Sequence, residues 1–239
     1  MVASVEDGET LVLTDGRKVR LAGIKAPSPP LGWKGEEPWP FVAEAKKALA
    51  ALATDQEVEL KFDERQTDRY GHVLAQVYVV REDLAPMWLE ERLLREGFAR
   101  VYSFADARAC VGELLAVEGE ARVERRGLWS SWAYRVQDAS DAKGLGRLTN
   151  SYQLVEGTVH AVGDGRKFIY LNFSDDWRHD FTVAIHRKDL AAFEAAGLDL
   201  EQLAGRTIRV RGWIEWQNGP IIVATHPEQL EVLTLAFAP

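Results

Sequence analysis

The sequence predicts a mainly β protein with helices (α+β), built as two successive small barrels. Short apolar runs follow one another in both halves, instead of alternating regularly with helices. A polar stretch at residues 136–150 interrupts this pattern, which then restarts. A chain of 239 residues is long enough for two domains that each bury a core. We therefore expect domains at residues 1–135 and 151–236, joined by a linker at 136–150.

The composition excludes several classes of protein. Hydrophobic residues make up 46% and charged residues 28% of the chain, which is ordinary for a globular protein. No apolar stretch is long enough to span a membrane. The net charge of −8 means that nucleic acid could bind only at a local basic patch. The single Cys110 rules out an intramolecular disulfide, and its helical surroundings predict a buried thiol.

The elements of the first half are recognisable one by one. Two strand-like runs flank Asp15-Gly16, a dipeptide typical of hairpin turns. The next segment contains five prolines. Proline disfavours both helix and central strand, so this segment is predicted to be a loop. Further along, apolar spacing predicts a helix at 41–53, strands at 57–63 and 73–80, and helices within 85–100 and 107–129.

The second half repeats a β pattern with one helical patch. The patch at 188–205 separates the third and fourth of five strand-like runs, which lie at 152–163, 166–174, 180–186, 206–216 and 220–226. Five strands with one helix in that place are the layout of an OB-fold barrel. We therefore expect an OB-fold-like second domain.

Five segments of the first half resemble the staphylococcal nuclease (thermonuclease) family. They are EDGETLVL, KVRLAGIKAPSP, TDRYGHVLAQVYV, LLREGFARVY and RRGLW, in this order. The resemblance covers nearly all of residues 5–132 and implies a nuclease-like OB barrel, phosphodiester hydrolysis and a calcium cofactor. The second half is similar to bacterial OB-fold modules found beside nucleases. The protein is thus expected to be a nuclease-like barrel followed by a second OB-fold-like, five-stranded barrel.

The resemblance also assigns residues to the family's catalytic positions. Glu9 takes the place of a metal-binding carboxylate, and Arg20 that of a phosphate-binding arginine. His72 stands where the family has a second arginine. Lys25 replaces a metal-binding aspartate, and Ser28 replaces the carboxylate that assists the attacking water. A lysine repels a calcium ion, so we expect a degraded metal site with Glu9 as its remaining ligand.

These substitutions leave the enzymatic outcome open. In one alternative, Lys25 binds phosphate directly and His72 serves as a general acid, so that hydrolysis is weak or altered. In the other, turnover is lost and the barrel is a pseudo-nuclease. Asp68 belongs to the same TDRYGH segment, where the sequence favours a structural role as the cap of a turn.

Candidate nucleic-acid contacts combine aromatic rings with arginines, because rings stack on bases and arginines bind phosphates. These candidates are Arg69, Tyr70, Tyr102, Phe168, Tyr170, Arg209, Arg211 and Trp213. Each also has a plainer interpretation: a structural turn for Arg69 and Tyr70, packing under the last helix for Tyr102, and a packed or solvated strand face for the residues of the second half. Strand alternation places Trp213 on the ligand side and Trp216 in the core.

Three functions therefore remain: a nuclease, a module that binds single-stranded DNA or RNA, and a scaffold for a protein partner. The eight tryptophans suit the third function as well as the second. The opening MVASVEDGET has no basic or apolar segment of the kind that directs export. Family members are often exported, so a removed signal peptide and a periplasmic location stay open, as do oligomeric state and DNA-versus-RNA preference.

Overall fold

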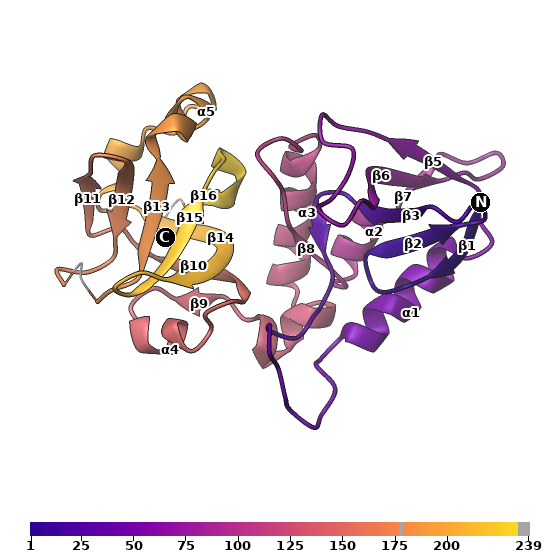
Figure 1. Ribbon diagram of the computed structural model, residues 1–239, viewed down its shortest axis with the longest axis horizontal. Helices are drawn as coiled ribbons and strands as arrows, with labels where there is room; N and C mark the ends of the chain where they lie inside the picture. The colour runs from indigo at the N-terminus through magenta and orange to yellow at the C-terminus, as the bar shows by residue number, and fades with distance from the viewer. Residues whose placement is uncertain (177–178, 234–239) are drawn as a thin grey trace, which may run out of the picture. The chain divides into compact units, whose positions relative to one another are not determined.

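The computed structural model describes residues 1–176 and 179–233. The chain forms two compact units (Figure 1), the first from Met1–Pro29 and Lys34–Tyr134, and the second from Pro30–Trp33 and from Arg135 onward. Each unit is a curved sheet with helices packed on it, which confirms the expected mainly β, α+β class. None of the helices in the described residues is long and apolar enough to cross a membrane.

The first unit contains eight strands and three α-helices within its described residues. The strands are β1 (Val2–Val5), β2 (Thr10–Leu13), β3 (Lys18–Leu21), β4 (Ile24–Lys25), β5 (Val58–Lys61), β6 (Val73–Val79), β7 (Met87–Trp88) and β8 (Arg100–Val101). The helices are α1 (Val42–Ala53), α2 (Leu89–Arg95) and α3 (Val111–Val123), followed by the 3-10 turns η1 (Gly127–Ser130) and η2 (Trp132–Tyr134).

The main sheet of this unit has the order β1-β2-β3-β6-β5. β2 and β3 form the expected hairpin, in which Gly16 has a φ of 86° and the Asp15 carboxylate accepts the Arg17 N–H. β3 then pairs in parallel with β6. The Val2 N–H donates to the Gln56 carbonyl just before β5, so the two ends of the sheet approach each other as in a barrel.

The second unit contains the remaining strands and two short α-helices. Its strands are β9 (Gln137–Asp138), β10 (Tyr152–Thr158), β11 (Ala161–Asp164), β12 (Phe168–Asn172), β13 (Thr182–His186), β14 (Thr207–Trp216), β15 (Pro220–Ala224) and β16 (Leu230–Val232). Its helical segments are α4 (Ala142–Gly146), η3 (Arg187–Asp189), α5 (Leu190–Ala195), η4 (Leu200–Leu203) and η5 (Pro227–Gln229). The stretch 136–150, expected as a linker, thus contains β9 and α4.

Six strands of this sheet form the barrel in the order β11-β12-β13-β15-β14-β10, and β9 pairs with β10 beyond this order. β10 and β11 follow each other directly along the chain, so both ends of the order belong to one bent strand region and the barrel closes. β13 and β15 pair in parallel, whereas the other pairs in this order are antiparallel. With α5 between β13 and β14, this is the expected five-stranded OB-fold layout.

Each unit buries its own core. In the first, α1 places Ala45, Leu49 and Ala53 against the sheet, which is the four-residue spacing expected of one helix face. In the second, inward residues of β12 alternate with outward ones, three consecutive residues of β13 (183–185) are buried, and Phe181 and Phe193 are fully buried. Burial of these apolar side chains is the main stabilising contribution in both barrels.

Two sequence expectations about the helices were wrong in detail. The helix expected within residues 85–100 begins only at Leu89, because Met87 and Trp88 pair with β6 as a short strand. Cys110 was expected to be buried, but it is exposed and has a φ of 61° immediately before α3. Cys110 lies just outside the helix, so helical periodicity does not predict whether its side chain is buried or exposed.

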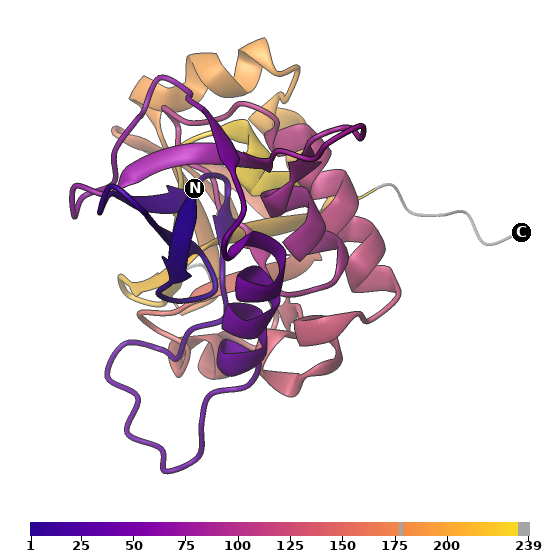
Figure 2. The same ribbon diagram turned by 90° about the vertical axis from the view of Figure 1, so that its right-hand side faces the viewer.

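The proline-rich segment has no regular structure. Residues 26–41 form a long loop that extends away from the sheet (Figure 2). The loop leaves directly from β4, and β4 pairs with β8. The ends of β2, β3 and β4 and the turn before β6 are therefore the parts of the first barrel that carry the candidate residues.

We expect Gly97→Ala to destabilise the first barrel more than a glycine replacement in open space. Gly97 has a φ of +73°, and a Cβ there would lie 2.2 Å from the Arg126 carbonyl oxygen. Left-handed backbone alone costs about 1–2 kcal/mol, and overlap with backbone that cannot rotate away adds to it. Urea denaturation measures the loss.

Two glycines provide matched controls. Gly71 has a φ of +80° with open space around it, so Gly71→Ala should lose only the conformational cost of about 1–2 kcal/mol. Gly119 lies inside α3 with no neighbour in reach, and Gly119→Ala should stabilise by about 0.5–1 kcal/mol. Equal losses for Gly97→Ala and Gly71→Ala would contradict the close backbone approach.

Candidate nucleic-acid site

The candidate site of the first barrel is organised by an ion pair between Glu9 and Arg20. The two residues lie on neighbouring strands, since Arg20 pairs in register with Thr10 and the Glu9 carbonyl accepts the Leu21 N–H. Arg20 Nη2 lies 2.8 Å from Glu9 Oε1, and both side chains are largely buried, with exposed fractions of 17% and 13%. The other oxygen of Glu9 accepts the Ala26 N–H. The ion pair therefore fixes the orientation of the guanidinium.

Asp68 approaches the same guanidinium from the turn before β6. Asp68 Oδ2 lies 3.9 Å from Arg20 Nη1 and 3.1 Å from His72 Nδ1. Its other oxygen, Oδ1, accepts the N–H groups of Tyr70 and His72, at 2.8 and 3.0 Å. The parallel pairing of β3 with β6 brings this turn beside Arg20. A continuous row of contacts results, running from Glu9 through Arg20 and Asp68 to the His72 ring.

The environment of Asp68 favours its ionised form. Burial by itself raises the pKa of the carboxyl, but hydrogen bonds from the backbone N–H groups of His72 and Tyr70 lower it. The nearby charges of His72 and Arg20 act in the same direction, and the net result is a pKa below the ordinary value. Asp68 was expected to cap its turn, and it does; the contact with Arg20 was not foreseen, because it depends on the strand pairing.

Lys25 lies on β4, where it pairs in register with the buried Arg100 of β8. Burial lowers the pKa of the Lys25 ammonium; the Glu9 charge raises it, and the positive charges of Arg100 and Arg20 lower it further. The net pKa lies below the ordinary value. Lys25 thus adds positive charge beside the Glu9–Arg20 pair, where the resemblance implied a metal-binding carboxylate.

The residues at this place do not fit a calcium ion. Calcium takes six to eight oxygen ligands, mainly carboxylates and carbonyls. Both oxygens of Glu9 and both oxygens of Asp68 already accept hydrogen bonds or ion pairs from the protein. In residues 1–176 and 179–233, no group of three or more His, Cys, Asp or Glu side chains gathers as a cation site. Ser28, half-buried in the loop, supplies no carboxylate.

The aromatic candidates of the first barrel lie near this row. Tyr70 is 64% exposed, and its ring is 6.0 Å from that of His72. The Arg69 guanidinium lies 4.8 Å from the centroid of the Tyr70 ring. Tyr102 follows β8, where its N–H donates to the Gly23 carbonyl and its ring meets Phe104 edge-on at 4.9 Å. Tyr70 with Arg69 is therefore the accessible ring and cation pair of this site.

The arginines of the second barrel differ from the expectation. Arg211 was expected on a ligand face but is 1% exposed, and its Nη2 lies 2.5 Å from Glu231 Oε1. Arg209 is also largely buried and pairs with both Glu156 and Glu231. The reason is β16, which pairs with β14 and brings Glu231 over these arginines. Strand alternation along β14 alone contains no sign of this cover.

The aromatic residues of the second barrel fall into two groups. Phe168 and Tyr170 are half-buried on β12, and Phe168 meets the His186 ring edge-on at 4.9 Å. On β14, Trp213 packs edge-on against Tyr152 at 6.2 Å. Trp216 was assigned to the core, yet it is 62% exposed and lies beside Gly146 of α4. Because Trp216 ends β14 at the hairpin, the core no longer covers its face there.

Comparisons with known proteins agree with the first barrel. Residues 18–131 match the family model described as Staphylococcal nuclease homologue. The chain is 36% identical over 136 residues to Protein ParB of Escherichia coli, covering 54% of this chain and 71% of that protein. It is 31% identical to the Micrococcal nuclease of Shigella flexneri and 27% identical to the Thermonuclease of Staphylococcus hyicus. Both matches cover 54% of this chain, and 72% and 75% of those proteins.

We expect Asp68 to make the stability of the first barrel depend on pH. Its folded pKa lies below the unfolded value of about 3.9, so the carboxylate contributes stability above that pH. The contribution is lost as the pH falls through the lower folded pKa. Asp68→Asn should therefore cost about 1–3 kcal/mol near neutral pH, and the difference should shrink in strong acid. Urea unfolding across a pH series measures this; a difference that stays constant with pH would contradict it.

Proposed function

The chain belongs to the staphylococcal nuclease family, and on that premise we propose that its first barrel binds nucleic acid at the phosphodiester backbone. The family match supports nucleic acid as the class of ligand. The oriented Arg20 guanidinium supports this part of the barrel as the binding site. A guanidinium can donate two parallel hydrogen bonds to one phosphate, and an arginine already held in one orientation loses less entropy on binding. In a chain with a net charge of −8, an anionic ligand requires local positive groups, which Arg20 and Lys25 supply here.

The finer proposal is that this site works without calcium. Lys25 has a positive charge at the position where the family has a metal ligand. The two carboxylate oxygens of Glu9 already contact Arg20 and the Ala26 N–H. Lys25 and Arg20 together then neutralise the phosphate, while Glu9 orients Arg20. Phosphodiester hydrolysis is weak, altered or lost as a consequence, since no metal-bound water is available to attack.

His72 is the group that could still transfer a proton. Asp68 binds its Nδ1, which leaves Nε2 as the nitrogen available to a ligand; within the described part of the chain Nε2 has no hydrogen-bond partner. A histidine held in this way can protonate a leaving oxygen, and this supports slow hydrolysis. The alternative is a pseudo-nuclease that binds single-stranded nucleic acid or a protein partner. All four carboxylate oxygens of Glu9 and Asp68 already have partners within the protein, and this favours the alternative over full activity.

We expect Arg20→Gln to weaken binding of a short single-stranded oligonucleotide by about tenfold or more. Losing one charged hydrogen bond to phosphate costs about 1.5–3 kcal/mol. It should also reduce the slope of log K against log salt by about 0.7. Fluorescence anisotropy at several salt concentrations measures both quantities.

Arg17→Gln is the matched control for this experiment. It removes the same charge at an exposed position, where Arg17 pairs with Asp15 outside the site. If Arg17→Gln and Arg20→Gln weaken binding equally, the effect is general electrostatics and the proposed site is wrong.

We expect calcium to have no effect on the native chain and to bind after Lys25→Asp. The replacement removes the repelling ammonium and restores a second carboxylate near Glu9, whereas Lys25→Ala removes only the charge. Calorimetric titration with calcium should give no heat for the native chain and measurable binding for Lys25→Asp. Calcium-dependent cleavage by the native chain that is abolished by Glu9→Gln would refute the metal-free proposal.

A further inference from the structure

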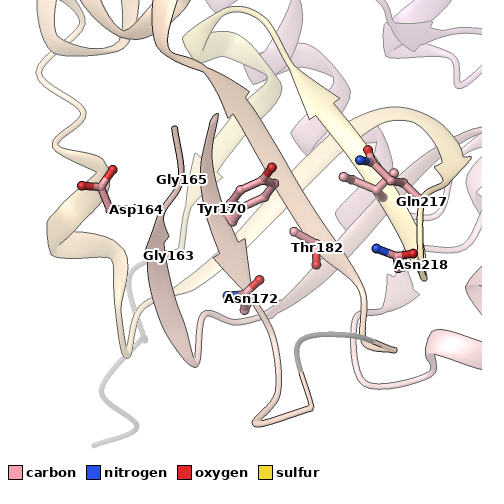
Figure 3. Close-up of a pocket in the computed structure, with 9 residues that line it drawn as sticks. Gly163, Asp164, Gly165, Tyr170, Asn172, Thr182, Gln217 and Asn218 are labelled. Carbon is pink, nitrogen blue, oxygen red and sulfur yellow. The ribbon is translucent and has the colours of Figure 1, made fainter. Parts of the chain in front are cut away.

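The second barrel has a cavity of about 540 Å³ on the outer side of its sheet. Figure 3 shows Tyr170, Asn172 and Thr182 on neighbouring strands, with Gln217 and Asn218 on the β14–β15 hairpin at the other side. Gly163, Asp164, Gly165 and Ile221 complete the lining. Its volume is within the range of about 300–1,000 Å³ that is usual for small-molecule sites.

Tyr170 stands between two strands that carry very small residues at its level. In register, Tyr170 pairs with Gly163 on β11 and with Ala184 on β13. A side chain directly opposite on a neighbouring strand would lie about 4.5–5.5 Å away and would cover the ring. A glycine has no side chain there and an alanine only a methyl group. The Tyr170 ring is therefore left open on the side that faces the cavity.

Gly165, in the β11–β12 turn, lies close to one edge of the Tyr170 ring. A Cβ at Gly165 would lie 2.7 Å from Cε2 of the ring and 2.9 Å from the Phe168 carbonyl oxygen. The absence of a side chain thus lets the β11–β12 turn lie against one edge of the ring. The turn thus supports the ring at one edge, the Phe168 ring lies 6.0 Å away along the same strand, and the partly exposed Tyr170 ring lines the cavity, where a planar group can stack on it.

Hydrogen-bonding groups surround this platform. The side-chain amides of Asn172, Gln217 and Asn218 and the Tyr170 hydroxyl line the cavity. In residues 1–176 and 179–233, these four groups have no hydrogen-bond partner within the protein. Each side-chain amide has an NH2 group that donates and a carbonyl oxygen that accepts hydrogen bonds. The hydroxyl can both donate and accept. The cavity can therefore match a planar ligand that has donors and acceptors along its edge.

The charge of the lining excludes a phosphate as the group that is recognised. Among the described lining residues there is no lysine or arginine, and the one charged residue is Asp164. The Asp164 carboxylate is paired with Arg187. This differs from the first barrel, where Arg20 and Lys25 supply positive charge. A lining without a cation, whose one carboxylate is already paired, offers nothing to neutralise a phosphodiester and suits a neutral group.

We propose that this cavity binds a single unpaired nucleobase, stacked on Tyr170 and hydrogen-bonded by Asn172, Gln217 and Asn218, with the phosphates left outside. The choice of nucleic acid rests on the proposed function of the first barrel; the base, as opposed to the backbone, follows from the lining. A nucleobase is flat and uncharged and alternates donors with acceptors, and its π-face stacks on an aromatic ring. The second barrel thus reads bases, whereas the first holds backbone.

The test is a titration of the full-length chain with nucleosides, which have a base and a sugar but no phosphate. Adenosine, guanosine, cytidine, uridine and a neutral disaccharide are added separately, and NMR follows the side-chain amide signals. At least one nucleoside should shift the signals of Asn172, Gln217 and Asn218, with binding that changes less than twofold between low and high salt. Saturation by the disaccharide with no response to any nucleoside would overturn the proposal.

Variants identify the contacts. Tyr170→Ala should weaken nucleoside binding by about tenfold or more, the size of one base–aromatic stack, while Tyr170→Phe keeps the ring and should change it little. Gln217→Ala removes a hairpin amide without touching the core, so it reports on the cavity even if Tyr170→Ala fails to fold. Gln56→Ala removes an exposed amide in the first barrel and is the matched control. Equal binding by Gln217→Ala, Asn172→Ala, Tyr170→Ala and the native chain would refute the proposed contacts.

Failure here can be distinguished from failure of the first proposal. Nucleosides lack the phosphate that Arg20 would bind, so Arg20→Gln should leave nucleoside binding unchanged. If nucleosides do not bind but oligonucleotides still bind in an Arg20-dependent way, the cavity proposal alone is wrong. If nucleosides bind but Arg20→Gln has no effect on oligonucleotides, the backbone proposal alone is wrong.

Discussion

Arg20 lies between two carboxylates, and the geometry of the first site depends on this arrangement. Glu9 lies 2.8 Å from one end of the guanidinium, and Asp68 lies 3.9 Å from the other. A largely buried guanidinium without such partners would carry a high desolvation cost, so the carboxylates make its position tolerable. Asp68 in turn fixes the Nδ1 side of His72. One buried cation thereby determines the orientation of three other side chains.

The same arrangement explains why metal chemistry is absent from the proposed function. A carboxylate that neutralises an arginine has less negative charge to offer a cation, and Lys25 adds repulsion. In the proposed function, the site therefore binds an anion and not a metal ion. Its chemistry resembles the many phosphate sites in which guanidinium and ammonium groups replace an ion.

Two barrels with the same arrangement of strands carry different chemistry. In each, the third strand of the barrel pairs in parallel with the last, as β3 with β6 and β13 with β15. The first barrel uses this pairing to bring Asp68 beside Arg20. The second places Thr182 beside Ile221, on a face with no cationic lining residue. A shared fold therefore says little about the ligand, which is decided by the side chains on it.

Much of the fold was predictable because its elements depend on patterns among residues close together in the sequence. The alternation in β12, the Asp15-Gly16 turn and the helical spacing of Ala45 and Leu49 depend on neighbours a few residues away. The errors fall where distant segments meet. Arg211 is buried because β16 returns to cover β14, and Trp216 is exposed because it lies at the end of that strand.

The candidate site divides in the same way. The sequence by itself determined the mainly β class, the nuclease resemblance and the types of residue at the family's positions, including Lys25 and His72. Residue types are local information, and a motif preserves their order. Pairing of Arg20 with Glu9 was one interpretation of the sequence, but only the tertiary structure decided that Asp68 joins Glu9 at the same guanidinium, and that Tyr170 has only Gly163 and Ala184 beside it on the neighbouring strands. Those facts depend on strand register, which long-range hydrogen bonds fix after the chain has folded.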